Sequence, residues 1–458
     1  LALALAWGAP RPALAAGAGA DPVGALPRLP SGAVALVAPP SPADPPGRAD
    51  YRIEASVDDL EDGGKGLTGR LVLRWTNAAG VAAEELWFHA YWNAFANNRS
   101  THLVENGGRL RGTSGEQPWG WQRITSVRVS DTDVTPSLAY RQPDGGPPED
   151  RTVFSVVPPR PVEPGETVTV ELAWTSRMPA LRRRTGAAGD FLFAAHWFPK
   201  LGGFEGERGW NCHEFHASTE FFSNYGWYDV TLDLPLRFQG KVFSSGKQVG
   251  NPELKGERVI TRFAAPSLQD REHVDATGRR PLVHGFTWTA DPLFKLRESN
   301  FNYDLWRTRF ADEVDAVQAA LGREKNLRLR TVQVSVLIHP EREDQWLRHY
   351  EATCAALFFY GLWFGEYPYE KVTVVDPAWS GRAAGGMEYP TLFTAGSRLF
   401  TRPSMHSPEG VVVHECGHQF WYGLVGSNEF EAAWMDEGFN SYTDSEVVWR
   451  VWGLRQST

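Results

Sequence analysis

Two histidines and two glutamates late in the sequence have the types and spacing of a metal-dependent hydrolytic site. His414 and His418 stand four residues apart in the string HECGH, and eighteen residues separate His418 from Glu437. On an α-helix, positions four apart differ by about 40° around the axis and about 6 Å along it, so both imidazoles project from one face. Two imidazoles and a carboxylate suit Zn²⁺ and leave a fourth position open for water. Glu415 lies beside these ligands, where a general base belongs.

The residues around this string predict the helix that must present it. Ser407 is expected as the N-cap, Pro408 as the first helical residue, and Glu409 as an acid near the positive end of the helix dipole. Residues 411–413 are valines and predict burial, where two histidines and a glutamate are costly without a function. Gly426 then predicts the helix end. We therefore favour a catalytic zinc site over the alternative, two structural histidines and a surface glutamate.

The two motifs of this region also resemble those of a known family. HExxH, the eighteen-residue spacing and Glu437 in the context WMDEGF resemble the aminopeptidase N family of gluzincin zinc metallopeptidases, which includes leukotriene hydrolase. The upstream stretch GGMEYP (385–390) is similar to the family's G-x-M-E-N segment, and weaker likeness extends back to about Tyr51. The resemblance implies a zinc aminopeptidase with one Zn²⁺ per chain on His414, His418 and Glu437.

The resemblance further implies that Gly385, Gly386, Met387 and Glu388 bind the substrate. The Glu388 carboxylate would pair with the ammonium of a free peptide N-terminus and so confine cleavage to the first residue. The two glycines would let the backbone approach the substrate closely. Tyr389 stands where the best-known members have Asn, which leaves strict exopeptidase behaviour open. The alternative for this stretch is a Gly-Gly turn followed by an ordinary exposed glutamate.

The predicted reaction is metal-assisted hydrolysis, in which Glu415 takes a proton from a zinc-activated water and passes it to the leaving amine. Glu431 is expected to orient one of the ligand histidines. The resemblance also implies an oxyanion-stabilising tyrosine well beyond Glu437. Because no tyrosine follows Tyr442, we interpret the chain as a fragment cut at both ends. Two other functions stay open: a zinc endopeptidase or other hydrolase of the same fold, and a non-catalytic binding scaffold.

Composition favours an exported, soluble enzyme. The net charge of −9 is spread without long runs, which gives no indication of nucleic-acid binding. Residues 1–20 resemble the second half of a signal peptide, with a disordered Ala-rich tail as the alternative and a retained anchor left open. We therefore expect a periplasmic, secreted or surface-attached protein. No other apolar run reaches the roughly 20 residues that a membrane span needs. The oligomeric state and the preferred first residue cannot be predicted.

Two further groups of residues have metal-binding or catalytic types without a strong template. Residues 212–216 read CHEFH, but their spacing matches no established zinc site, so we favour a structural role. The three cysteines allow at most one disulfide, and Cys416 is expected to pack on the side of the helix away from the metal. The resemblance places His196 near the amine end of the substrate, although a structural role is favoured here too.

The pattern along the chain predicts a multidomain fold. Residues 21–48 form an Ala/Gly/Pro-rich linker. Residues 49–290 are β-rich and predict one antiparallel, saddle- or sandwich-shaped N-terminal domain, with strands at 67–76, 85–91, 167–174 and 228–234. Residues 291–458 predict a thermolysin-like α+β catalytic domain, incomplete at its C-terminus, with strands at 332–338 and 371–375 and a helix at 343–364.

Overall fold

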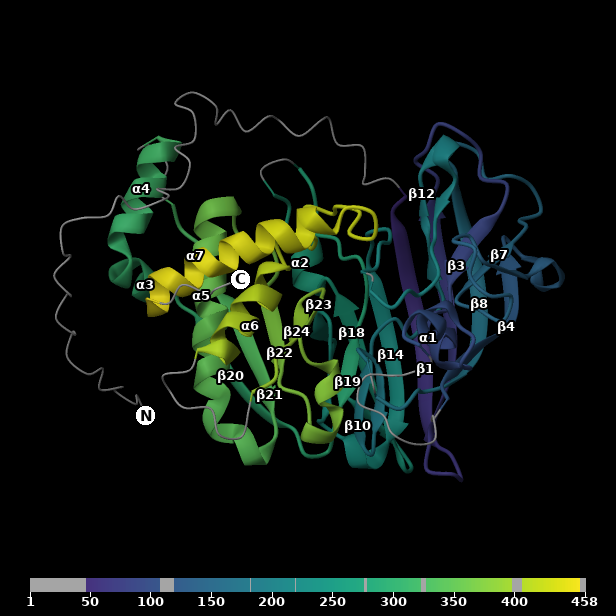
Figure 1. Cartoon of the computed structure of the whole chain (residues 1–458), viewed down its shortest axis with the longest axis horizontal. Coiled ribbons are helices and arrows are strands. Elements are labelled where there is room, and N and C mark those ends of the chain that lie inside the picture. The colour runs from purple at the N-terminus through teal and green to yellow at the C-terminus, as the bar shows by residue number, and fades with distance from the viewer. Residues whose placement is uncertain are drawn as a thin grey trace. The chain divides into compact units, whose positions relative to one another are not determined.

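The computed structural model describes residues 47–107, 119–181, 183–218, 220–275, 278–322, 327–397 and 406–453 (Figure 1). The predicted signal-peptide segment and nearly all of the predicted linker lie outside the described residues. The described residues belong to one compact unit, and the predicted division near residue 290 stays a prediction. No helix in the described part of the chain is long and apolar enough to cross a membrane.

Among the described residues, nine strands form one large sheet in the order β16-β18-β14-β1-β2-β8-β4-β5, with β17 paired to β18. These strands are β1 (Ala49–Asp59), β2 (Lys65–Thr76), β4 (Trp121–Val129), β5 (Thr132–Asp133), β8 (Thr167–Arg177), β14 (Tyr228–Pro235), β16 (Lys247–Gln248), β17 (Glu253–Lys255) and β18 (Arg258–Ala265). Alternate residues of β1 and β14 are buried, as expected for strands with one face on a core. The prediction of a wholly antiparallel domain is wrong, because β1 and β14 run parallel.

Segments between these strands, together with β19 after the last of them, form three smaller sheets. One has the order β11-β3-β7-β6 and another the order β15-β19-β10-β9, while β12 pairs with β13. Their bounds are β3 (Leu86–His89), β6 (Ala139–Arg141), β7 (Val153–Val156), β9 (Gly186–Ala188), β10 (Phe191–Ala194), β11 (Lys200–Leu201), β12 (Gly203–Phe204), β13 (Trp210–Asn211), β15 (Val242–Ser244) and β19 (Trp288–Ala290). Two short helices, α1 (Thr101–Glu105) and α2 (Leu268–Glu272), also belong to this part. β11 and the residues after β10 reach the candidate site described below.

A five-stranded mixed sheet carries the later motifs. Its order is β20-β21-β22-β24-β23, in which β21, β22 and β24 are parallel and both edge strands are antiparallel. The strands are β20 (Lys295–Phe301), β21 (Val332–Ile338), β22 (Lys371–Val375), β23 (Met387–Tyr389) and β24 (Leu392–Thr394). β21 and β22 are buried almost throughout, which explains their nearly unbroken apolar sequences. The segment GGMEYP therefore ends in an edge strand, β23.

Helices pack beside this sheet, with α3 and α4 against α5 on its outer side (Figure 1). They are α3 (Tyr303–Arg309), α4 (Ala311–Leu321), α5 (Trp346–Phe364), α6 (Ser407–Gly417) and α7 (Phe439–Trp452), with a π-helical turn, η7 (Trp434–Gly438), before α7. α5 packs against β20 and β21, and α6 packs against α5, α7, β23 and β24. The HECGH string is thus held between a helix layer and the sheet edge that carries Glu388.

Predicted and observed helices differ mainly at their ends. α5 begins at Trp346, later than predicted, because residues from Pro340 to Gln345 form a 3₁₀ turn that Pro340 opens. The predicted N-cap of α6 is wrong: Ser407 is already helical, His406 is the cap residue, and no side chain caps the helix. Val411 is 37 % exposed, whereas the next two valines are buried as predicted.

Two apolar clusters back the candidate site. The larger one runs without a break from the nine-stranded sheet to α5, α6 and α7. The smaller one lies beneath β23 and combines Phe191 and Phe193 of β10 with Met387, Tyr389 and Leu392. The edge strand is therefore packed against residues from both the β-rich part and the later part of the chain.

Candidate metal centre and adjoining pocket

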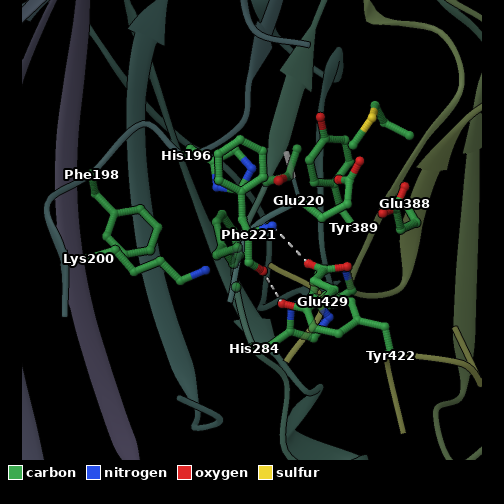
Figure 2. A pocket seen from close by; sticks show the side chains of 15 residues that line it. His196, Phe198, Lys200, Glu220, Phe221, His284, Glu388, Tyr389, Tyr422 and Glu429 are labelled. Carbon is green, nitrogen blue, oxygen red and sulfur yellow. Dashed lines mark hydrogen bonds between the residues drawn. The ribbon is translucent and has the colours of Figure 1, made fainter. Parts of the chain in front are cut away.

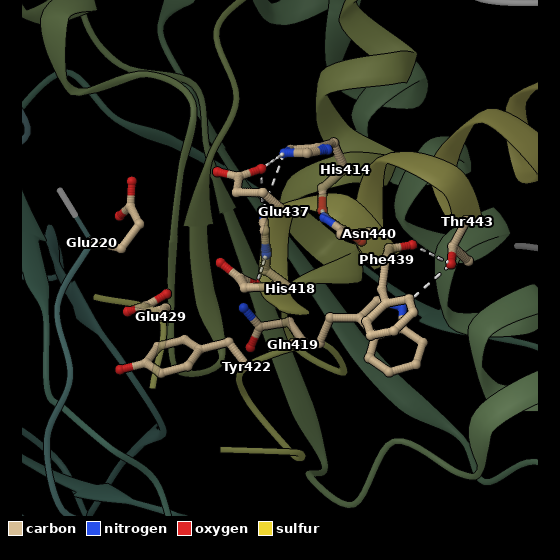
Figure 3. Close-up of polar contacts among 12 residues, drawn as sticks. Glu220, His414, His418, Gln419, Tyr422, Glu429, Glu437, Phe439, Asn440 and Thr443 are labelled. Atoms are coloured by element: carbon tan, nitrogen blue, oxygen red, sulfur yellow. Dashed lines mark hydrogen bonds and ion pairs between the residues drawn. The ribbon is translucent and has the colours of Figure 1, made fainter. Parts of the chain in front are cut away.

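α6 and its last turn direct His414 and His418 toward one point (Figure 3). Their Nε2 atoms lie 3.1 Å apart, and the two rings are nearly perpendicular, at 89°. The i, i+4 spacing has therefore placed both imidazoles on one helix face, as the sequence predicts. His418 is buried, while the side chain of His414 is partly open to solvent.

Glu437 reaches the same point from the π-helical turn η7. Its Oε2 atom lies 3.2 Å from His414 Nε2 and 3.7 Å from His418 Nε2. The three side chains each offer a ligand atom within 4.8 Å of the other two. A π-helical turn is rare and often occurs at functional sites. The structure thus brings together the three residues that the sequence pairs with a metal.

Two aspartates orient the imidazoles. Asp444 Oδ2 lies 2.7 Å from His414 Nδ1, and Asp436 Oδ1 lies 2.5 Å from His418 Nδ1. Because an ionised carboxylate only accepts, each Nδ1 donates its proton and each Nε2 keeps a free lone pair. The prediction that Glu431 has this role is wrong, because its carboxylate pairs with Arg208 at 3.1 Å. Asp436 adjoins Glu437 in the sequence, and that adjacency could have identified it.

Gly417 and Asn440 fix α6 against its neighbours. Asn440 Nδ2 donates to the carbonyl of His414 at 2.7 Å, and Tyr360 Oη donates to Asn440 Oδ1 at 2.6 Å. A Cβ atom at Gly417 would lie 2.0 Å from Asn440 Oδ1 and 2.3 Å from Tyr360 Oη. The glycine of HECGH therefore permits the close helix contact that holds the backbone of His414.

Glu415 lies beside the three converging ligand atoms, against the chain that leads into β23. A Cβ atom on Gly386, which has φ +72°, would lie 3.6 Å from Glu415 Oε1. The Oε2 atom of Glu415 is buried and has no hydrogen-bond partner among the described residues. Burial raises the pKa of Glu415 to about 7, although the two histidines counteract this shift. Glu415 is thus poised to exchange a proton near neutral pH.

Gln419 ties the end of the HECGH helix to the edge strand. Its Nε2 donates to Tyr389 O at 2.9 Å, and its Oε1 accepts from Thr391 N at 2.7 Å. These bonds bring Glu388 close enough for one of its oxygens to lie within 4.8 Å of ligand atoms of Glu415 and His418. Sequence reasoning missed Gln419, although it follows His418 directly.

Beyond Glu388 lies a pocket with walls from both parts of the chain (Figure 2). Met387 and Tyr389 line it from β23, while Gly385 and Gly386 precede that strand. Glu220 and Glu429 complete a second group with Glu388, again with oxygens within 4.8 Å of one another. Other side chains that line this pocket include Lys200, His196, Phe198 and Phe221. Glu220, Glu429 and Lys200 were not singled out from the sequence, because they come from distant segments.

The acids of this pocket are crowded. Arg184 pairs with both oxygens of Glu220, at 2.7 and 2.8 Å. Glu429 accepts from Phe221 N at 3.1 Å through Oε1, and its Oε2 is buried without a partner among the described residues. Burial raises the pKa of Glu388 and of Glu429 well above their ordinary values, and neighbouring carboxylates add to both shifts. A cation is therefore the favoured occupant of the space beside these oxygens.

Tyr389 and His196 are wall residues of the pocket. The Tyr389 ring is buried against Phe193, with ring centroids 5.5 Å apart. The His196 ring lies 4.0 Å from Phe221, and burial lowers its pKa well below the ordinary value. A buried neutral imidazole against aromatic rings agrees with the structural role favoured for His196.

The CHEFH stretch forms a hydrogen-bonded cluster. Asp144, Glu214 and His216 offer ligand atoms within 4.8 Å of one another. However, both oxygens of Glu214 accept backbone N–H groups, of Asp144 at 2.8 Å and Gly146 at 3.0 Å. Asp144 pairs with His213 at 2.7 Å as well as with His216 at 3.2 Å. These bonds agree with the structural role favoured from the sequence. All three cysteines are free and buried.

The charges of the candidate metal centre are strongly coupled. Burial lowers the pKa of His414, but hydrogen bonds to Asp444 and Glu437 outweigh it and raise the pKa to about 10. Hydrogen bonds from both histidines hold the pKa of Glu437 well below its ordinary value. Without a metal, the repulsion between the three converging ligand atoms is therefore relieved only when one of them binds an additional proton.

Comparisons with known proteins concern the fold. No protein-family model matches the sequence, and no curated protein matches it. Among solved structures, an M1 zinc metallopeptidase from Deinococcus radiodurans has 16 % sequence identity and a TM-score of 0.50, over 89 % of this chain and 72 % of that one. A mutant of a two-domain M1 zinc metallopeptidase bound to L-arginine has the same identity and coverage and a TM-score of 0.51. The chain therefore has the fold of M1 zinc metallopeptidases.

Proposed function

We propose that this protein is a zinc-dependent aminopeptidase that removes the first residue from peptides. The observation that carries the proposal is the convergence of His414, His418 and Glu437 beside Glu415, with Glu388 within reach of the same group. The likeness in fold to M1 zinc metallopeptidases supports it.

The donor set fits zinc. Because Asp444 and Asp436 accept the Nδ1 protons, two Nε2 lone pairs and a carboxylate oxygen face one another across 3.1–3.7 Å. Such an arrangement is repulsive unless a cation or a proton lies between the three atoms. Two imidazoles and one carboxylate form a common ligand set of catalytic zinc. His414, His418 and Glu437 would hold the ion, and Asp436 and Asp444 would fix the ring orientations.

Each remaining residue has a defined task in the proposed reaction. Bound zinc would act as a Lewis acid that polarises the substrate carbonyl and acidifies a water molecule. Glu415 takes the proton of the attacking water on its unpartnered Oε2 and delivers it to the departing amine nitrogen. Glu388 accepts hydrogen bonds from the substrate's ammonium, which sets where the chain is cut. Gly386 lets the substrate backbone pass close to Glu415.

The test compares one short peptide with its N-terminus free and acetylated, using zinc-loaded protein. We expect cleavage of the free form only, one residue at a time, and loss of cleavage after chelation. Equal cleavage of both forms would instead identify a zinc endopeptidase and remove the anchoring role from Glu388. Bound zinc without any cleavage would leave a binding scaffold. Zinc content near one per chain, measured in parallel, checks the metal assignment.

A further inference from the structure

A buried lysine faces the pocket from the side opposite the edge strand. Lys200 is only 5 % exposed, and it extends from β11. Figure 2 shows its amino group directed toward the middle of the pocket, beside Phe221. Among the described residues no hydrogen bond or salt bridge joins this amino group, and only a longer-range attraction links it to Glu429. A buried amino group without an acceptor is costly, so the site favours a ligand that supplies one.

The pocket therefore has two chemically different sides. Glu388 belongs both to the group with Glu415 and His418 and to the group with Glu220 and Glu429. We consider a peptide whose ammonium lies at Glu388 and whose first carbonyl lies near Glu415. The side chain of its first residue would then enter the rest of the pocket. That space leads past aromatic walls, including Phe198 and Phe221, toward Lys200. The first side chain and the amino group of Lys200 would then meet.

We propose that Lys200 selects peptides whose first side chain ends in an oxygen acceptor, a carboxamide or a carboxylate, and disfavours a cationic first side chain. This inference rests on the proposed aminopeptidase function and adds the substrate class to it. The acceptor oxygen would take a hydrogen bond from Lys200, whereas a second ammonium in the same enclosure would be repelled. Burial lowers the pKa of Lys200 to about 7, and the amino group keeps N–H donors in either protonation state.

Glu429 distinguishes the two acceptor side chains. Its unpartnered Oε2 is an acceptor inside the same pocket. A carboxamide carries an oxygen for Lys200 and an N–H donor for Glu429, whereas a carboxylate carries acceptors only and has no N–H to offer Glu429. We therefore expect glutamine to be the better first residue and glutamate the weaker of the two.

The test measures kcat/KM for tripeptides X-Ala-Ala, with X being Gln, Glu, Leu or Lys, on zinc-loaded protein. A hydrogen bond to a charged group predicts that Gln exceeds Leu by about 10–100-fold, with Lys the poorest. Lys200→Met keeps the stem and removes the donor, so the Gln/Leu ratio of kcat/KM should fall at least about tenfold. Calorimetric binding of glutaminamide and leucinamide gives a second readout that does not depend on turnover.

Lys65→Met is the matched control. Lys65 is similarly buried, at 7 % exposure, but pairs with Asp59 at 2.6 Å and Asp190 at 3.0 Å outside the pocket. The Lys65→Met variant should leave the Gln/Leu ratio unchanged. An equal loss on all four peptides in Lys200→Met, or a wild-type preference for Leu or Lys, overturns the inference and leaves the aminopeptidase function standing. If none of the four peptides is cleaved, the inference about Lys200 and the proposed aminopeptidase function are both overturned.

Discussion

Substitution of Gly417 by Ala should loosen the helix that carries both histidines. The added Cβ would lie 2.0 Å from Asn440 Oδ1 and 2.3 Å from Tyr360 Oη, far inside contact distance. Asn440 and Tyr360 are fully buried, so neither can move aside without disturbing its neighbours. Their hydrogen bonds, at 2.6 and 2.7 Å, would have to lengthen together with the helix contact.

The magnitude follows from three opposing effects. Overpacking a closed contact costs about 1–3 kcal/mol. Disturbing buried hydrogen bonds adds about 1–3 kcal/mol. Alanine returns about 1 kcal/mol through its greater helix propensity. We therefore expect Gly417→Ala to lower the free energy of unfolding by about 1–5 kcal/mol.

The assay is urea unfolding of the metal-free protein, so that zinc affinity does not enter the comparison. Gly438→Ala is the matched control, because its Cβ would lie 3.8 Å from Trp434 Cβ, an ordinary contact. That variant should be neutral or slightly more stable than the wild type. Gly417→Ala with wild-type stability would refute the close packing of α6 against α5 and α7.

Three more outcomes follow from the site. Glu415→Gln should reduce hydrolysis by at least about 10²–10⁴-fold while zinc content stays at one per chain; metal loss in this variant would contradict the base assignment. Asp436→Ala should weaken zinc binding about 10–100-fold in chelator competition, whereas Glu431→Ala should not, and equal effects would undo the orienting role of Asp436. Burial lowers the pKa of Lys200 from 10.5 to about 7, so the unfolded chain holds this proton more tightly between those values. The destabilisation caused by burying the Lys200 ammonium is therefore complete below pH 7. It decreases as the pH rises to 10.5, by at most about 1.4 kcal/mol per pH unit. Lys200→Met should thus exceed the wild type in stability at pH 6 and lose that advantage by pH 10; an advantage independent of pH would contradict the lowered pKa.

Local patterns allowed much of the fold to be predicted. The strands at 332–338 and 371–375 match β21 and β22 residue for residue, because short β-branched runs between breakers leave few other choices. The pairing partners could not be predicted. β14 lies parallel to β1 across some 170 residues of intervening sequence, and nothing in either strand specifies its neighbour.

The candidate site shows the same division. His414 and His418 could be paired from helix geometry, residue type and spacing indicated Glu437, and the family resemblance added Glu388. Residues whose roles depend on distant segments escaped notice. In the sequence Lys200 is an ordinary strand residue, and its role depends on the position of β11 beside the pocket. Glu429 is an ordinary loop acid in the sequence, and its role depends on its contact with Phe221 N. Glu431 was predicted and Asp436 was missed, because spacing without a known backbone path cannot tell which carboxylate faces the ring.

The π-helical turn makes this protein unusually sensitive to chain length at one place. Residues 419–433 connect α6 to the turn outside any named helix or strand. Removal of the last residue of the turn Trp434–Gly438 would convert it to an ordinary α-helical turn. The carboxylates of Asp436 and Glu437 would then rotate by about 100° around the helix axis relative to α7. Glu437 would then face away from His414 while every residue type of the motif was still present. Sequence searches that permit gaps would score such a chain as intact, although its metal centre had been lost.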